Sequence, residues 1–390
     1  MRVIYIGAFR LPNFDAAAPR VLNNAKAMRD AGCNLTFISW GGKYRDEDLC
    51  EDGFYRVDGF RYIISDDLLS QGTFFQKLKA KSFRGWKSFK ILKTLAKPDL
   101  IVLYNSNQSF TTRILKYCEK NSIKLANDIT EWYDNNELHL LDILPNYFNM
   151  TRTQFRVKNK IVISSYLNEF YKDSNNILVP PLCDKDEPKW NACVEDERIK
   201  PFDGISLIYA GTPAKKDCVH TVINAVNTLA EEGKPIRFII LGISREQYSK
   251  GYSHFLLNKN LHKNIIFLGR VSQESIPAYY KMADFMVLLR EPNRKNMAGF
   301  PTKFAESITA GVPVITNATS DLANYVTTGK TGFLVDSPEY SDLLNLLRNK
   351  VLILNDLDIE NLKTNTSKLS QEFDWHFYKD GFKRFLENLK

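Results

Sequence analysis

The feature that most constrains the fold is an alternation of short apolar runs with segments of helical periodicity. Apolar, β-branched and aromatic runs bounded by turn residues occupy 3–9, 34–40, 60–65, 100–105, 123–128, 160–165, 176–179, 205–210, 236–241, 264–268, 285–290, 312–316 and 331–335. Between them, segments such as 19–32 and 217–233 repeat apolar residues at helical spacing. Strand, helix and strand in repeated order predict an α/β fold with parallel sheets and helices on both faces.

The series is interrupted once, between residues 180 and 204, by a segment with four prolines and many charges. We interpret 183–203 as a linker. It joins two Rossmann-like, doubly wound lobes, 1–182 and 204–370, and a helical stretch, 371–390, closes the chain. Ligands of such folds bind at the carboxyl ends of the strands, so we expect the site in a central cleft that both lobes face.

Composition and motifs exclude several classes of protein. With 44% hydrophobic and 25% charged residues, the chain is globular rather than disordered or fibrous, and no apolar run approaches the roughly 20 residues of a membrane-spanning helix. The first residues resemble no signal peptide, and the six cysteines form no CxxC pair, so we expect a cytoplasmic protein with reduced thiols. The dinucleotide fingerprint and the phosphate-binding P-loop are absent. Asp-x-Asp triplets lie only in polar or linker segments, so we expect no metal and no cofactor.

The net charge of +8 is concentrated in residues 74–97, which contain eight basic residues and no acid. Apolar and small residues recur there at steps of three and four, namely Leu78, Ser82, Trp86, Phe89, Leu92 and Ala96. We predict a helix that lies on an anionic membrane surface. The alternative is an ordinary surface helix packed through its aromatic side. Nucleic acid is not an expected partner, because no second basic aromatic strip accompanies this one.

Two segments of the second lobe could bind an anion or a sugar. After the strand 205–210, Gly211 lets a ligand approach the backbone, Asp217 is placed to cap the next helix, and Lys215 and Lys216 precede that helix's positive end. This pattern suits a diphosphate, although lysine pairs in loops are usually only solvated.

The second segment follows the strand 285–290. Pro301 is expected at the first position of a helix, 302–310, that stops at Gly311. The amides of Gly299, Phe300, Thr302 and Lys303 would then donate to phosphate or sugar hydroxyls. Glu306, one turn into the helix, can accept from vicinal hydroxyls such as those of a ribose, or it can merely complement the helix dipole.

These residues together carry a resemblance to a known family. The ordered motifs YAGTPAKKD (209–217), IIFLGRV (265–271), FPTKFAES (300–307), AGVPVIT (310–316) and TTGKTGFLV (327–335) resemble the carboxyl-terminal lobe of the family 4 glycosyltransferases, which have the GT-B fold. The first lobe is similar more loosely, and FDWHFYKDGF resembles the family's last helix, which crosses back onto the first lobe.

The resemblance implies a retaining, metal-independent transferase that moves a sugar from a UDP- or GDP-sugar to an acceptor hydroxyl. Carried over by position, Gly211 and Lys216 match the diphosphate site, Arg270 and Val271 match the loop that holds the base, and Glu306 matches the acid on the ribose. Residues 299–303 match the loop whose amides hold the donor. Arg10, Ala18 and Arg20 match the loop that faces the reaction centre and the acceptor.

The chain departs from the family's pattern at two positions. Ala298 stands where the first of two paired glutamates is common, as in a subgroup with PTKF at 301–304, and Thr212 stands where an arginine is common. Lys215, Lys216 or Arg290 must then supply the second positive charge. In the first lobe, Asp128, Thr130 and Glu131 follow a strand and are candidates for contact with the donor sugar or the acceptor.

We expect a lipid-linked or polysaccharide acceptor in cell-surface glycan synthesis, at the inner face of the plasma membrane. Two alternatives stay open, namely a nucleotide-sugar 2-epimerase of the same fold and a non-catalytic partner subunit.

Overall fold

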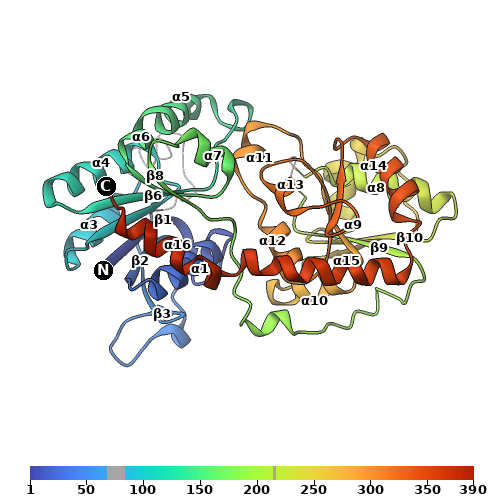
Figure 1. The fold of residues 1–390 in the computed structure, drawn as a ribbon, viewed down its shortest axis with the longest axis horizontal. Coiled ribbons are helices and arrows are strands. Elements are labelled where there is room, and N and C mark those ends of the chain that lie inside the picture. The colour runs from blue at the N-terminus through green and yellow to red at the C-terminus, as the bar shows by residue number, and fades with distance from the viewer. Residues whose placement is uncertain (68–83, 214–216) are drawn as a thin grey trace. The chain divides into compact units, whose positions relative to one another are not determined.

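The computed structural model describes residues 1–67, 84–213 and 217–390. The chain forms two compact units (Figure 1). The first comprises Met1–Cys183, Ala298–Phe300 and Trp375–Lys390, and the second comprises Asp184–Met297 and Pro301–Asp374. Of the segment 183–203, which the sequence analysis interpreted as a linker, all residues from 184 onward therefore group with the second unit. There Trp190 is buried, and its carbonyl accepts a hydrogen bond from the Lys281 ammonium.

The first unit is built on an eight-stranded sheet in the order β3-β4-β2-β1-β5-β6-β7-β8, parallel except for the pair β3 and β4. Its strands are β1 (Arg2–Leu11), β2 (Asn34–Gly42), β3 (Arg56–Val57), β4 (Phe60–Ile64), β5 (Leu100–Tyr104), β6 (Lys124–Ile129), β7 (Asn159–Val162) and β8 (Asn175–Leu178). Its helices are α1 (Ala17–Asp30), α3 (Trp86–Thr94), α4 (Gln108–Asn121), α5 (Leu140–Phe148), α6 (Gln154–Arg156), α7 (Ser165–Phe170) and α16 (Lys379–Glu387).

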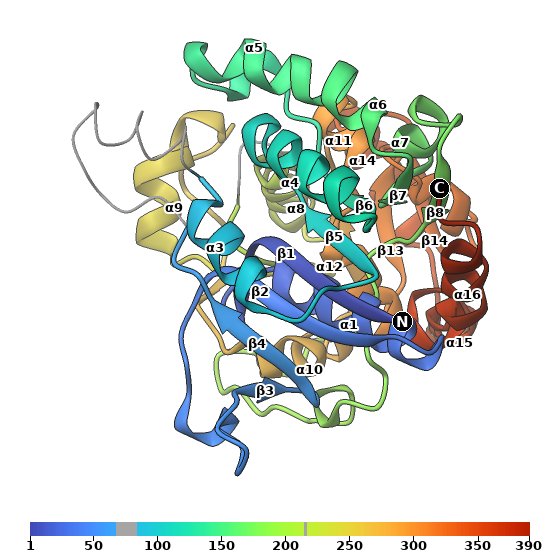
Figure 2. The same ribbon diagram turned by 90° about the vertical axis from the view of Figure 1, so that its left-hand side faces the viewer.

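Both faces of this sheet are covered, because successive side chains of a strand point to opposite faces. Val3 and Tyr5 of β1 join a core with α1 and α16, and Ile4 and Ile6 join a second core with α3 and α4. Figure 2 shows α4 and α1 on opposite sides of the strands. The last helix, α16, thus packs in the first unit although it ends the chain.

The second unit is built on a six-stranded parallel sheet in the order β11-β10-β9-β12-β13-β14. Its strands are β9 (Ile205–Ala210), β10 (Ile236–Leu241), β11 (Ile265–Gly269), β12 (Phe285–Leu288), β13 (Val314–Asn317) and β14 (Gly332–Val335). The helices are α8 (Val219–Glu231), α9 (Arg245–Tyr252), α10 (Ile276–Lys281), α11 (Arg294–Ala298), α12 (Thr302–Thr309), α13 (Leu322–Tyr325), α14 (Tyr340–Leu346) and α15 (Asp356–Leu369). Every residue of β9 and β10 is buried, as expected for strands covered on both faces.

The predicted fold class, two Rossmann-like parallel sheets, is confirmed, and every strand expected from the sequence coincides with an observed one. The two-residue strand β3 was not expected. In the basic segment, residues 74–83 lie outside the described residues, whereas 86–94 form α3, whose Phe89 and Leu92 are buried in the first unit. Over the described parts of the chain, no helix combines the length and the apolar character needed to span a membrane.

A buried ion pair connects α1 with β6 inside the first unit. Arg20 and Asp128 are 4% and 0% exposed, and the Nη2 atom of Arg20 lies 2.7 Å from Oδ1 of Asp128. The other nitrogens of Arg20 are also used, since Nε donates to the same carboxylate and Nη1 donates to the carbonyls of Val179 and Pro180. Tyr5 and Asn24 donate to Oδ2 of Asp128. The pair therefore contributes to the interior of the unit.

We predict that Arg20→Met lowers the free energy of unfolding by about 3–5 kcal/mol, because the charge of Asp128 would stay buried without its counter-ion. Arg56→Met is the control, since Arg56 pairs with Asp52 at the surface and exposed pairs contribute little. Urea unfolding of both variants and the parent measures the difference. Equal stability of Arg20→Met and the parent would contradict this role.

Candidate functional site

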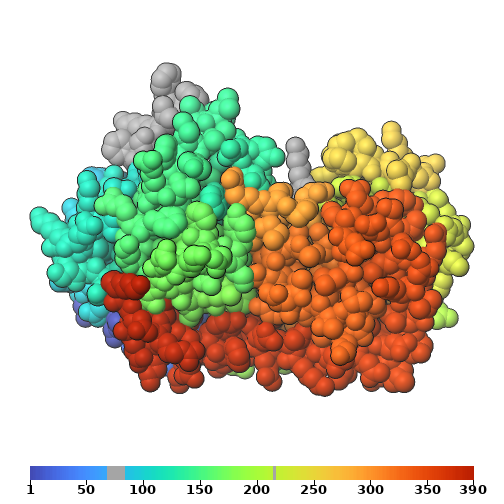
Figure 3. All heavy atoms as spheres, turned by 45° about the horizontal axis from the view of Figure 1, so that its top comes forward, coloured from blue at the N-terminus to red at the C-terminus, as the bar shows by residue number. Residues whose placement is uncertain are grey.

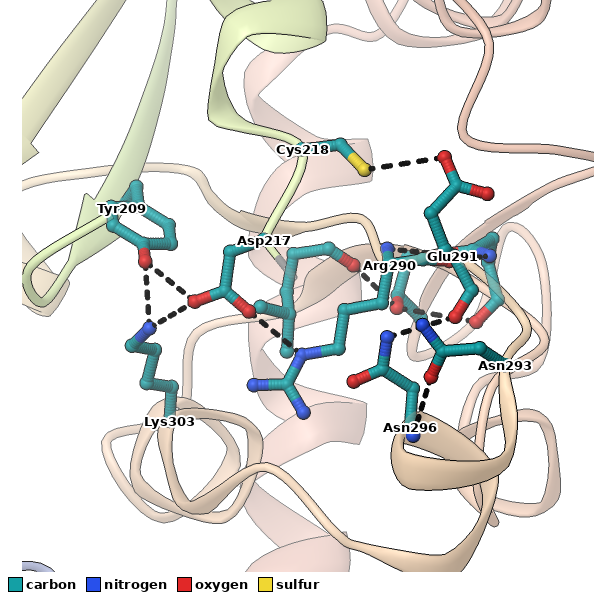
Figure 4. A network of polar contacts seen from close by, with 11 residues as sticks. Tyr209, Asp217, Cys218, Arg290, Glu291, Asn293, Asn296 and Lys303 are labelled. Carbon is teal, nitrogen blue, oxygen red and sulfur yellow. Dashed lines mark hydrogen bonds and ion pairs between the residues drawn. The ribbon is translucent and has the colours of Figure 1, made fainter. Parts of the chain in front are cut away.

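The site of the second unit is centred on the Asp217 carboxylate, at the carboxyl ends of β9 and β12. Asp217 is 1% exposed and accepts from three groups: Lys303 Nζ at 2.6 Å, Arg290 Nε at 2.8 Å and the Tyr209 hydroxyl at 2.7 Å. The Lys303 ammonium also donates to the Tyr209 hydroxyl at 2.7 Å. Figure 4 shows Asp217 between the two cations. Two cations and one carboxylate leave one positive charge in surplus.

Burial and charge act against each other on this cluster. Burial favours a raised pKa for Asp217, but the charges of Lys303 and Arg290 and its hydrogen bonds outweigh it, so the pKa lies below its ordinary value. Burial lowers the pKa of Lys303, and the charge of Asp217 opposes this shift. Burial and the charge of Asp217 raise the pKa of Tyr209. At neutral pH the site therefore holds an ionised Asp217 and a neutral Tyr209.

Arg290 has unused donors although only 7% of its side chain is exposed. Its Nε donates to Asp217, whereas Nη1 and Nη2 donate to no residue that the structure describes. In Figure 4 no dashed line leaves these two terminal nitrogens. In Arg20 of the first unit, by contrast, all three nitrogens are used. An arginine with so little exposed surface normally has partners for its donors. An anion beside Arg290 would supply the missing acceptor.

The backbone around Arg290 is held in place by side chains from the neighbouring loop and strand. The side-chain amide of Asn317 bonds the amide and the carbonyl of Arg290, at 2.9 and 2.7 Å. The amide of Asn296 donates to the carbonyl of Glu291, and the Cys218 thiol lies 3.9 Å from the Glu291 carboxylate. The guanidinium is thus presented from a backbone that is fixed before any ligand binds.

Gly211 lies directly under the ammonium of Lys303. A Cβ atom at position 211 would stand 2.5 Å from Cε and 3.0 Å from Nζ of Lys303, and the φ of Gly211 is +133°. Only glycine combines this backbone with such a close approach. Among the described residues, Lys303 therefore places a cation at the glycine loop. Thr212 is exposed, and its hydroxyl lies 3.4 Å from the Gly242 carbonyl.

Glu306 belongs to α12, on the turn that follows Lys303. It is half-buried, and its carboxylate accepts no hydrogen bond from the described residues. Burial raises its pKa, and the nearby positive charges of Lys189 and Lys303 oppose this. A carboxylate with free acceptor capacity beside two lysines can accept from ligand hydroxyls. Lys189 was not expected here, because the sequence analysis assigned it to a linker.

The other donor-side candidates of the second unit occupy the loops after its strands. Arg270 is exposed and Val271 half-buried, immediately after β11. Pro301 caps α12, one position earlier than expected, and Thr302 begins that helix. Gly299 and Phe300 group with the first unit. Lys215 and Lys216 lie outside the described residues, so their roles stay predictions.

One expectation about this loop is wrong. Asp217 does not cap the helix that follows it, because α8 has Cys218 at its N-cap and no side chain bonds there. The carboxylate of Asp217 is instead held by the two cations and by Tyr209. Sequence spacing could not reveal this, since Lys303 is 86 residues away.

The candidates of the first unit lie in different environments. Ala18, Arg20 and Asp128 are buried, and the polar atoms of the last two are used within the unit. Thr130 is also buried, and the Asn105 amide donates to its hydroxyl at 2.5 Å. Arg10 is exposed and Glu131 half-buried. These side chains are thus explained by the unit itself, and contact of any of them with an acceptor stays a prediction.

Two Rossmann-like sheets covered by helices, the second with a cationic site at its carboxyl edge, are the architecture of the GT-B fold. Residues 196–366, most of the second unit, match the family described as "Glycosyl transferases group 1". This match confirms the resemblance to GT-B glycosyltransferases, whereas the PTKF subgroup stays a prediction.

Relatives and solved structures agree with this class. Capsular polysaccharide biosynthesis glycosyltransferase CapM of Staphylococcus aureus is 23% identical over 189 residues, which is 47% of each chain; the chain thus matches about half the length of this curated relative. Sucrose-phosphate synthase from Thermosynechococcus elongatus superposes with a TM-score of 0.71 at 16% identity, covering 99% of this chain and 97% of the other. Anabaena Alr3699/HepE, solved in complex with UDP and glucose, gives 0.70 at 15% identity over 100% of both chains.

We predict that Asp217→Asn destabilises the protein most at neutral pH. The pKa of Asp217 is lowered on folding, so its contribution is complete above its unfolded pKa of about 3.9 and is lost as the pH falls below that value. Urea unfolding of parent and variant, in a series from about pH 7 to about pH 3, should show their difference in unfolding free energy narrowing toward acid. A difference that does not vary with pH would contradict an ionised Asp217 in the native protein.

Proposed function

We propose that the protein is a retaining glycosyltransferase that moves a sugar from a nucleotide-diphosphate donor to an acceptor hydroxyl. The observation that carries the proposal is Arg290, a buried arginine with unused terminal nitrogens beside Lys303. In a GT-B protein whose second unit matches the glycosyl transferases, a diphosphate is the anion that this pair suits best.

The chemistry follows from the surplus charge. When the bond between sugar and diphosphate breaks, negative charge develops on the leaving phosphate oxygens. Lys303 and Arg290 stabilise that charge without moving far, because Asp217 and the fixed backbone at Arg290 already orient them. We propose that these side chains do so without a metal ion.

We propose that Glu306 accepts hydrogen bonds from the ribose hydroxyls of the donor and that the loop at Arg270 and Val271 holds the base. The free acceptor capacity of Glu306, one turn after Lys303, supports this assignment. UDP is the nucleotide to test first, because an Anabaena protein of the same fold has been solved in complex with UDP and glucose.

For the acceptor we propose a lipid-linked or polysaccharide hydroxyl in cell-surface glycan synthesis. The similarity to a capsular polysaccharide glycosyltransferase supports this class. We further propose a cytoplasmic protein that contacts the anionic inner face of the plasma membrane. The exposed lysines of α3, Lys87, Lys90 and Lys93, support that contact.

We predict that Lys303→Met weakens UDP binding about ten- to hundredfold, because a charge-assisted contact with the diphosphate contributes about 1.5–3 kcal/mol. Isothermal titration calorimetry measures the affinity. Lys363→Met is a matched control, since Lys363 pairs with Asp284 at 3.1 Å at the amino end of β12, away from the site. The proposal fails if the parent protein binds and hydrolyses none of the UDP-, GDP- and ADP-sugars.

A second variant tests the assignment of Glu306. Glu306→Gln should lower the affinity for UDP about tenfold, because a neutral amide accepts more weakly than a carboxylate from two hydroxyls. It should leave the affinity for 2′,3′-dideoxy-UDP unchanged. Equal losses for the two nucleotides would show that Glu306 acts on another part of the ligand or on the fold.

A further inference from the structure

Helix α5 of the first unit has its apolar side turned outward. Leu140 and Leu144 are 81% and 64% exposed, Leu141 and Tyr147 are also exposed, and none of the nine residues of α5 is buried. Positions 140, 144 and 147 fall on one side of a helix. Figure 1 shows α5 at the edge of the first unit, and in Figure 3 its green atoms lie at the surface.

The half-buried side of α5 is mixed, since the apolar Ile143 and Phe148 lie there beside two polar residues. Asp142 and Asn146 are half-buried. The charge of Asp142 acts on Arg84, and the amide of Asn146 donates to the carbonyl of Tyr133 at 3.3 Å. The hydrogen bond of Asn146 is consistent with this orientation of the helix. A cluster of exposed leucines is typical of a surface that binds a membrane or another protein.

Positive and aromatic groups adjoin this leucine face. The charge of Asp142 acts through space on Arg84, which precedes α3, and Trp86 and Lys87 of α3 are exposed. Trp86 also lies 4.8 Å from the guanidinium of Arg113 on α4. At the other end of α5, the exposed Arg152 lies over the ring of Phe148. Leucines flanked by arginine, lysine and tryptophan are typical of protein surfaces that lie in the interface of an anionic bilayer.

We infer that α5 inserts the side chains of Leu140, Leu141 and Leu144 into an anionic lipid surface, with the first turn of α3 at the headgroups. The inference deepens the proposed membrane contact, on which it rests. It also changes the lipid-facing element expected from the sequence, because Phe89 and Leu92 of α3 are buried in the core and cannot insert.

The test measures co-flotation of the protein with vesicles of phosphatidylglycerol and phosphatidylcholine, and with phosphatidylcholine alone. The parent should bind the anionic vesicles. The double variant Leu140→Ser with Leu144→Ser should bind them about tenfold more weakly or less, because two leucines no longer enter the bilayer. The control is Ile353→Ser with Leu357→Ser in the second unit, whose parent side chains are 72% and 64% exposed; it should bind like the parent.

Three outcomes would overturn the inference. They are equal vesicle binding by the α5 variant and the parent, no binding of the parent to anionic vesicles, and a dimer of the parent in solution that the α5 variant abolishes. Unfolding midpoints of all variants check that the fold is intact. Calorimetry with UDP is run separately, so a protein that binds vesicles but no nucleotide would refute the glycosyltransferase proposal and leave the role of α5 standing.

Discussion

The second unit depends on one carboxylate that holds two cations in a buried site. Asp217 brings together the loop after β9, the end of β12 and the first turn of α12, through Tyr209, Arg290 and Lys303. Without it, two positive charges would repel each other where water screens them weakly, and Lys303, whose pKa burial already lowers, would lose its proton more readily. Asp217 neutralises only one of the two charges. The remaining positive charge is fixed in position before a ligand arrives, which is the condition under which electrostatic stabilisation is most effective.

Two buried arginine–aspartate pairs in this protein differ in whether the terminal nitrogens of the arginine have hydrogen-bond acceptors. Every side-chain nitrogen of Arg20 donates a hydrogen bond, either to Asp128 or to a backbone carbonyl. Arg20 therefore stabilises the first unit and has no nitrogen left without a partner. Arg290 uses only Nε on Asp217, and its two terminal nitrogens contact no acceptor in the described chain. Burial and charge are similar in both pairs. The unused terminal nitrogens of Arg290 therefore distinguish it from Arg20 as a candidate for ligand binding.

The sequence predicts the fold well, because the alternation of buried strands and helices is a local pattern that a single chain displays. It predicts the site only in part. Resemblance to a family singled out Gly211 and Glu306, named Arg290 as one of three candidates for a second positive charge, and assigned Lys303 only a backbone amide; the contact of the Lys303 ammonium with Asp217 was not predicted. The role of Asp217 itself was missed, because a capping pattern is read from neighbours whereas its partners stand far along the chain. For the basic segment, periodicity shows that a helix has an apolar side but not whether the core covers it. The core covers Phe89 and Leu92 of α3, whereas contact of the segment with a membrane stays a prediction.

The same limit explains why α5 did not stand out in the sequence. Its leucines suggest a buried helix, and rolling the helix by half a turn would bury them. That roll would break the hydrogen bond from Asn146 to the Tyr133 carbonyl. In the observed orientation the leucines of α5 are exposed to water, which is unfavourable for apolar surface. Burial of these leucines in a lipid surface would be favourable, because it removes apolar surface from water. In this respect α5 parallels Arg290, whose free donors gain a partner only when an anion binds.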